Sequence, residues 1–157
     1  MIQNWKSYLF WILLAEAVGG LSGWLTREGT EIYAQTIMKP PLAPPGWVFP
    51  VVWSALYGLM GIGAARVYQT PPSRPRSMGL NLFVAQLMVN FFWSPIFFNL
   101  QAFGLAFLLL LLLWGLVLCM ILVFRKADPL AAKLQIPYFL WLTFAAYLNW
   151  GVWYLNM

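Results

Sequence analysis

Long apolar runs alternate with short polar segments along the whole chain. Each run extends over about 20 residues, the length that a helix needs to cross the hydrocarbon core of a bilayer. Charged residues, prolines or glycines bound every run. The pattern predicts five transmembrane helices, over residues 7–25, 47–67, 79–98, 102–124 and 137–155.

A transmembrane β-barrel does not fit the pattern, because its strands alternate lipid-facing and lumen-facing residues. Residues 107–113, for example, are continuously apolar. Pro50 and Pro137 fall in first turns of predicted spans, where the missing N–H costs little, and Pro95 lies near the end of the third span. We therefore predict an all-α integral membrane protein, a five-transmembrane-helix bundle that forms one domain over residues 1–157.

The first apolar run has an alternative interpretation as a signal peptide. Lys6 precedes it, and residues 15–17 (AEA) resemble the small-x-small site at which such peptides are cleaved. The apolar character continues to Leu25, which a full span requires and a cleaved segment does not. We favour a span.

Composition agrees with a membrane protein and excludes several classes of enzyme. Of the 157 residues, 62% are hydrophobic and 8% are charged, against roughly 25% charged in soluble domains. Histidine is absent, which excludes imidazole general bases, Ser-His or Cys-His pairs, and His-ligated haem or zinc. Cys119, the single cysteine, rules out an intrachain disulfide and is expected in the core. We predict no metal, no resident cofactor and no catalytic residue.

Lysine and arginine are distributed unevenly between the two predicted sides of the membrane. Seven lie on the side of the N-terminus and two, Arg27 and Lys39, lie on the other. The positive-inside rule then places the N-terminus inside and the C-terminus outside. Because these cations lie at loop ends and form no groove-reading face, we expect no nucleic-acid partner.

The loop over residues 26–46 is long for a small bundle. It carries apolar residues in a helical rhythm and ends in the stiff segment KPPLAPPG. It is predicted to be a lid over a cavity, although an interfacial helix resting on lipid explains the same pattern. Residues 69–78, QTPPSRPRSM, are predicted to form a solvated turn.

Polar side chains recur at helical spacing within two of the spans. Gln86, Asn90 and Ser94 follow one another at steps of four, and Trp141 and Asn149 lie on a similar stripe with an alanine between them. Such stripes line a pocket or supply interhelical hydrogen bonds, and the residues alone leave both interpretations open.

The ten tryptophans divide into two groups. Five lie at span ends, as an interfacial belt requires, and five lie deeper: Trp11, Trp53, Trp93, Trp114 and Trp141. Trp53 and Tyr57 form one aromatic face, which could stack on a flat aromatic ligand or simply pack in the core.

Glu16 is the only carboxylate within a predicted span. An ionised carboxylate is costly there, so we expect it to be protonated, paired or open to a wet cavity, and it is a candidate cavity residue. Gly19 and Gly23 beside it form a small-residue surface, for which packing inside the bundle is a simpler explanation than dimerisation.

Three segments of the sequence combine prolines, aromatic residues and the polar stripes described above. They are KPPLAPPGWVFPVVWSALYGLMG (39–61), QLMVNFFWSPIFF (86–98) and PYFLWLTFAAYLNW (137–150). Together they resemble the TspO/MBR family of tryptophan-rich sensory proteins and translocator proteins. The resemblance implies a five-helix bundle, commonly a homodimer, whose cavity opens under the first loop. It implies binding of protoporphyrin IX or a related tetrapyrrole, sterols and benzodiazepine-site drugs.

The resemblance also implies a set of ligand-binding positions. They are Trp53, Tyr57, Gln86, Asn90, Trp93, Trp141, Ala145 and Leu148.

The sequence departs from the family pattern at three places. Leu42 replaces an aromatic residue in the proline-rich segment, Leu105 replaces a tryptophan of animal members, and the C-terminal sterol pattern lacks its cation. These departures favour a bacterial member in the cytoplasmic membrane, with tetrapyrroles as ligands.

We therefore expect a membrane receptor or translocator-type protein that binds tetrapyrroles and other hydrophobic small molecules within the bundle. One alternative is a light-dependent porphyrin-degrading enzyme, in which the ligand itself would supply the photochemistry. Another is a small-molecule transporter, for which a dimer would have to supply the internal symmetry that five spans lack.

Overall fold

The computed structural model describes residues 2–157, with side chains from Asn4 onward, and this part of the chain contains no strand. The helices follow one another with short connections, except for residues 37–47 between α2 and α3. In chain order they are α1 (Ile2–Leu25), α2 (Arg27–Thr36), α3 (Val48–Tyr68), α4 (Arg74–Ser94), the π-helical η1 (Pro95–Asn99), α5 (Phe103–Ala127), α6 (Pro129–Leu134) and α7 (Ile136–Leu155).

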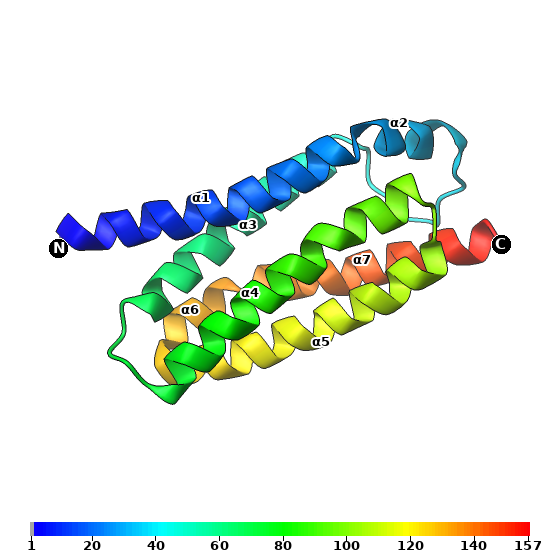
Figure 1. Cartoon of the computed structure of the whole chain (residues 1–157). Helices are drawn as coiled ribbons and strands as arrows, with labels where there is room; N and C mark the ends of the chain where they lie inside the picture. The colour runs from blue at the N-terminus through cyan, green and yellow to red at the C-terminus, as the bar shows by residue number, and fades with distance from the viewer. Residues whose placement is uncertain (1) are drawn as a thin grey trace.

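The long helices run side by side as a bundle, with the two chain termini at opposite ends (Figure 1). α1 packs along α3, while α5 packs against both α4 and α7. α2 lies across the end of the bundle near the C-terminus, and α6 lies at the other end. Fully buried Met60, Phe83, Leu110, Phe124 and Tyr138 fill the interior between these helices.

Among the described residues, four helices are long and apolar enough to cross a membrane: α1 from Asn4, α3, α4 together with η1, and α5. The expected count of five spans is therefore not confirmed. α7 has 20 residues and extends beside α5 (Figure 1). It carries three tryptophans and three tyrosines, which are less hydrophobic than the aliphatic residues that fill α5.

Two expectations about the connecting segments require correction. The long loop contains α2, and a further short helix, α6, follows α5, so the chain has more helices than the predicted five. The predicted turn over residues 69–78 was wrong in its second half, because α4 begins at Arg74. Ser73 caps this helix by accepting a hydrogen bond from the Arg76 backbone N–H at 3.1 Å, and a proline in the first turn needs no N–H partner.

Pro95 changes the helical geometry and links two helices. It has no N–H to donate to the carbonyl of Phe91 four residues earlier. Ser22 of α1 donates its hydroxyl to that Phe91 carbonyl at 2.8 Å. Beyond Pro95 the chain widens into η1, in which the Leu100 N–H bonds the Pro95 carbonyl at 3.0 Å.

Glycines allow α1 and α3 to approach closely. A Cβ at Gly19 would overlap the Tyr57 ring, and one at Gly61 would lie 2.6 Å from the Ile12 backbone nitrogen. Gly20 and Gly23 instead have open space beside them. The expected packing role is therefore confirmed for Gly19, whereas Gly20 and Gly23 lie on the outer surface.

The two predicted groups of tryptophans differ in exposure as expected. Those at the span ends are exposed, and the five deeper ones are all partly buried. The expectation for Cys119 was wrong, because its side chain is exposed on α5. A small apolar residue is equally compatible with a lipid-facing surface, so its position within an apolar run did not determine which way it faces.

Candidate functional site

A chain of hydrogen bonds crosses the bundle interior and joins α3, α4 and α7. Tyr57 donates its hydroxyl to the Asn90 side-chain oxygen. Asn90 donates from its amide to the Tyr138 hydroxyl at 2.8 Å, and Tyr138 donates to the Gln86 side-chain oxygen at 2.7 Å. The Gln86 amide then lies 3.9 Å from the sulfur of Met60. We call Tyr57, Asn90, Tyr138 and Gln86 the polar relay.

The polar relay is buried throughout. Gln86 and Tyr138 have no exposed surface, and Asn90 and Tyr57 are 5% and 7% exposed. Gln86 and Asn90 lie one turn apart on α4, so Tyr138 from α7 reaches both. The interhelical hydrogen-bond interpretation of the α4 stripe is therefore confirmed for these two residues, because both side chains bond the Tyr138 hydroxyl of α7.

An aromatic cluster lies directly against the polar relay. Trp53 stacks on Tyr57, one turn further along α3, with ring centroids 5.5 Å apart. The Trp53 ring also meets two residues of α7 edge to face, Tyr138 at 6.1 Å and Trp141 at 6.4 Å. Phe49 adds a further ring 5.9 Å from Trp141. Trp53 is thus the centre of the cluster.

Trp141 carries a buried polar atom without a partner. Its indole N–H is shielded from solvent and makes no hydrogen bond within the described residues. A buried donor without an acceptor is costly. This N–H is therefore available to an acceptor that enters the cluster.

The space between α3 and α7 is bridged by side chains. α3 packs closely on α1, α4 and α6, and α7 packs closely on α5, but α3 and α7 are not close neighbours along their backbones. The rings of Trp53, Tyr138 and Trp141 span the distance between them. Aromatic side chains therefore form much of the contact between these two helices.

Some of the predicted binding positions lie outside this cluster. Trp93 donates its indole N–H to the Asn149 side chain at 3.0 Å and stacks on Phe97 at 4.9 Å. Asn149 in turn donates to the Phe103 carbonyl at 2.9 Å. This second cluster therefore ties α4, η1, α5 and α7 together near the lid.

The structure brings Trp53, Tyr57, Gln86, Asn90 and Trp141 together. Ala145 and Leu148 are buried on α7, further toward its C-terminus.

Sequence reasoning missed Tyr138 as a residue of the site. It is the hydrogen-bonding centre of the polar relay, and it shares a helical face of α7 with the buried residues Leu142, Ala145 and Asn149. Extending the polar stripe of that span by one helical repeat toward Pro137 would have reached it.

The N-terminal half of the lid segment, residues 26–46, packs on η1 through α2. Gly29 faces the Phe98 backbone so closely that an added Cβ would lie 2.9 Å from its carbonyl oxygen. Tyr33 packs against Phe97 and Phe98, with centroids 5.5 and 5.2 Å away. Burial raises the pKa of the Tyr33 hydroxyl to about 12, so it remains neutral at physiological pH. Lys39 donates to the Tyr33 carbonyl at 3.0 Å, which caps the end of α2.

The C-terminal half of the lid is fastened to α7. Asn156 donates to the Met38 carbonyl at 2.8 Å and accepts from the Met38 N–H at 3.1 Å. Tyr147 donates to the Pro41 carbonyl at 2.7 Å. The segment thus rests on protein at both ends, which favours the lid interpretation over a helix lying on lipid alone.

Glu16 lies between α1 and α3 and is only partly buried. A Cβ added to Gly58 would be 3.6 Å from a Glu16 carboxylate oxygen. The structure records no ion pair for Glu16 within residues 4–157. Glu16 makes no hydrogen bond to the polar relay within the described side chains.

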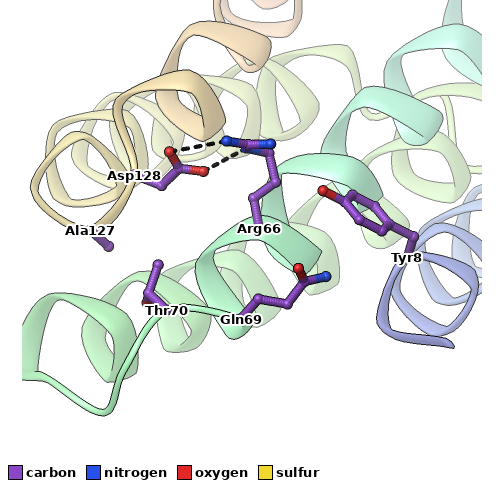
Figure 2. Close-up of a pocket in the computed structure, with 6 residues that line it drawn as sticks. All are labelled: Tyr8, Arg66, Gln69, Thr70, Ala127 and Asp128. Atoms are coloured by element: carbon purple, nitrogen blue, oxygen red, sulfur yellow. Dashed lines mark hydrogen bonds and ion pairs between the residues drawn. The ribbon is translucent and has the colours of Figure 1, made fainter. Parts of the chain in front are cut away.

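A polar pocket of about 240 Å³ lies at the other end of the bundle, away from the lid. Figure 2 shows Arg66 of α3 reaching Asp128 at the start of α6, with the Tyr8 hydroxyl of α1 directed toward the same guanidinium. The Arg66 Nε atom donates to Asp128 at 2.6 Å, and the second contact is 3.5 Å. This ion pair fastens α3 to the α5–α6 connection.

Comparison with known proteins gives a consistent result along the chain. Residues 11–155 match the TspO/MBR family. The chain is 38% identical over 144 residues to Protein CrtK of Rhodobacter capsulatus, which covers 91% of this chain and 89% of that protein. It is 36% identical over 144 residues to the Translocator protein of Ovis aries, with 89% and 85% covered. It is 35% identical over 144 residues to the Tryptophan-rich protein TspO of Chlorobaculum tepidum, with 91% of both chains covered.

Proposed function

The chain belongs to the TspO/MBR family of membrane proteins, and from this premise we propose that it binds a planar tetrapyrrole such as protoporphyrin IX between α3 and α7. The observation that carries the proposal is the aromatic bridge. Trp53, Tyr138 and Trp141 connect two helices whose backbones do not pack closely. A flat ligand inserted there would separate these aromatic side chains from one another and stack on them instead.

The unpaired indole N–H of Trp141 supports a ligand that carries acceptors. Tetrapyrroles carry carboxylate side chains, which accept hydrogen bonds from indole donors. The amides of Gln86 and Asn90 already have partners in the polar relay. They would therefore have to give up an existing hydrogen bond to bind the ligand. The Trp141 N–H can bind it without losing a hydrogen bond.

The lid provides the entrance in this proposal. α2 and the proline-rich segment cover the end of the bundle. Met38 and Pro41, which follow α2, are held by hydrogen bonds from Asn156, just after α7, and from Tyr147 of α7. α7 also carries Trp141. Release of the lid and movement of the aromatic bridge therefore involve the same helix, so we propose that ligand entry couples the two.

We further propose that α7 is a fifth span, with the N-terminus inside and the C-terminus outside a bacterial cytoplasmic membrane. The two termini lie at opposite ends of the bundle. Seven lysines and arginines belong to the N-terminal side and two to the lid side, which supports this orientation by the positive-inside rule.

A quenching titration tests the binding proposal. Purified protein is titrated with protoporphyrin IX, and the affinity is compared among wild type, Trp53→Ala, Trp141→Ala and the control Trp150→Ala. Trp150 is 48% exposed near the end of α7. Each cluster variant should weaken binding about tenfold, from lost stacking of about 0.5–1.5 kcal/mol together with lost contact area. Affinities within about twofold of wild type in both cluster variants would place the ligand elsewhere.

Illumination of wild type and of two phenylalanine variants distinguishes binding from turnover. Trp53 and Trp141 meet edge to face at 6.4 Å, so both indoles would contact a bound porphyrin. Product analysis after illumination, with a dark control, identifies an enzyme if porphyrin is consumed by wild type and spared by Trp53→Phe or Trp141→Phe. Equal fading in all samples indicates binding without turnover.

A further inference from the structure

A groove of about 630 Å³ opens on the surface of the bundle at the end opposite the lid. It lies between the first turns of α1 and the end of α3, within the size range of small-molecule sites. The groove adjoins the Arg66 pocket, because Gln69 lines both. It shares no lining residue with the aromatic cluster or the polar relay.

The rim of the groove is polar and carries one cation. Lys6 and Ser7 of α1 lie opposite Gln69, which follows α3. The Gln69 amide donates to the Asn4 carbonyl at 3.4 Å and so holds the two helix ends together. Lys6 is exposed and forms no ion pair within the described side chains. The rim thus offers an ammonium, a hydroxyl and amides to one ligand group.

The wall of the groove is aromatic. Phe10 is 59% exposed, and Trp11 faces Tyr68 with centroids 5.9 Å apart. Trp11 also packs edge to face on the fully buried Phe83 at 5.6 Å, which fixes its position. Below the rim, exposed Leu13 continues the apolar surface along α1 into the membrane region.

The charge around the groove is strongly positive. Seven of the nine lysines and arginines belong to this end of the bundle, with Asp128 as the one carboxylate among them. Asp128 is engaged by Arg66. Arg76 does not line the groove, but its guanidinium lies 4.8 Å from the ring centroid of Tyr68, which does.

We propose that this groove binds one anionic phospholipid, with its phosphate at Lys6 and its acyl chain along Phe10 and Trp11. A polar cationic rim above an aromatic wall matches a molecule with an anionic head and an apolar tail. A basic pocket between transmembrane helices is a known arrangement for anionic headgroups. A soluble anion would leave the aromatic wall unused, because it has no apolar part.

A sterol fits the groove less well. Lys6, Tyr8 and Leu13 fit a reversed sterol-binding pattern, in which a cation, a tyrosine and a leucine follow one another along the chain. However, the Tyr8 side chain lines the Arg66 pocket (Figure 2), not the wall of this groove. The cation and the tyrosine of that pattern therefore face different cavities. A sterol hydroxyl also carries no charge to pair with Lys6.

Brominated lipids test the proposal, because bromine quenches tryptophans that it contacts. Wild type and Trp11→Phe are reconstituted in vesicles of phosphatidylcholine and phosphatidylglycerol, with bromine on the acyl chains of either lipid at equal mole fraction. The difference between the two proteins gives the quenching of Trp11. We expect brominated phosphatidylglycerol to quench Trp11 more strongly than brominated phosphatidylcholine. Lys6→Gln should lower this preference about fivefold, the contribution of one cation near an anionic lipid.

Lys133→Gln is the matched control, since Lys133 is an exposed cation at the same end of the bundle that lines neither cavity. It should retain the wild-type preference. Equal quenching of Trp11 by the two lipids would overturn the proposal. The same holds if Lys6→Gln keeps the full preference, or if brominated cholesterol quenches Trp11 more strongly than phosphatidylglycerol.

Discussion

Tyr138→Phe removes one hydroxyl from the centre of the polar relay and leaves the ring in place. The hydroxyl accepts from Asn90 at 2.8 Å and donates to Gln86 at 2.7 Å, in a residue with no exposed surface. Both amides would then lack that partner. A hydrogen bond between membrane helices contributes about 0.6 kcal/mol on average and at most about 1.7 kcal/mol. The loss of two should lower the free energy of unfolding by about 1 to 3 kcal/mol.

The assay is unfolding of the purified protein in mixed micelles by increasing detergent denaturant, followed by far-ultraviolet circular dichroism. Tyr154→Phe is the control, because Tyr154 is 61% exposed and removing its hydroxyl breaks no hydrogen bond within the described residues. It should unfold as wild type does.

A double-mutant cycle separates the hydrogen bond from other effects of the substitution. Gln86→Met combined with Tyr138→Phe replaces both partners of one bond by apolar groups, so the pair should cost less than the sum of the single variants. A Tyr138→Phe protein that matches wild type in stability would refute the energetic role of the polar relay. Strict additivity in the cycle would show that the Gln86–Tyr138 bond contributes nothing.

Three further predictions concern helix contact, lid geometry and topology. Gly19→Ala should destabilise the bundle by about 1–3 kcal/mol, because the added methyl group would overpack against α3. Gly20→Ala should be neutral or stabilising in the same unfolding assay, because Gly20 has open space beside it. Equal effects of the two substitutions would contradict the close approach of α1 and α3. Leu42 has φ 72°, a left-handed conformation that favours glycine, so Leu42→Gly should stabilise the lid turn by about 1 kcal/mol. The expected result is slower proteolysis of the lid. Faster proteolysis would argue against backbone strain at Leu42. Single cysteines at Gln101 and Ser77, in a cysteine-free background, should label from opposite faces of the membrane, and labelling of both from outside would contradict the proposed topology.

The helices were largely predictable because their apolar runs must match the thickness of a bilayer. The predicted spans and the helices differ by a few residues at most ends. The start of α1 differs by five residues, and so does the start of α4. There, Ser73 and the following proline form a helix N-terminus, a signal that was present in the sequence but was outweighed by its Pro/Ser/Arg composition.

The site was predictable only in part, because a stripe of side chains does not identify its partner. The spacing of Gln86 and Asn90 placed them on one face, but their common partner, Tyr138, depends on how α7 is rotated about its axis. The partner of the Phe91 carbonyl that Pro95 leaves free, the Ser22 hydroxyl, likewise lies on another helix and depends on how the two helices pack. The run around Cys119 is apolar on every face, so its pattern did not predict that the Cys119 side chain points outward.

The most direct test of tetrapyrrole binding between α3 and α7 is a titration of indole-¹⁵N-labelled protein with protoporphyrin IX, followed by nuclear magnetic resonance. The macrocycle shifts nuclei near its face through its ring current, so the ten indole N–H signals report its position. We predict saturable shifts of the Trp53 and Trp141 signals, with the Trp141 signal moving most because its N–H has no partner within the described residues. The Trp5 and Trp150 signals should stay unchanged. Shifts confined to these exposed tryptophans, with Trp53 and Trp141 unaffected, would contradict the proposed site.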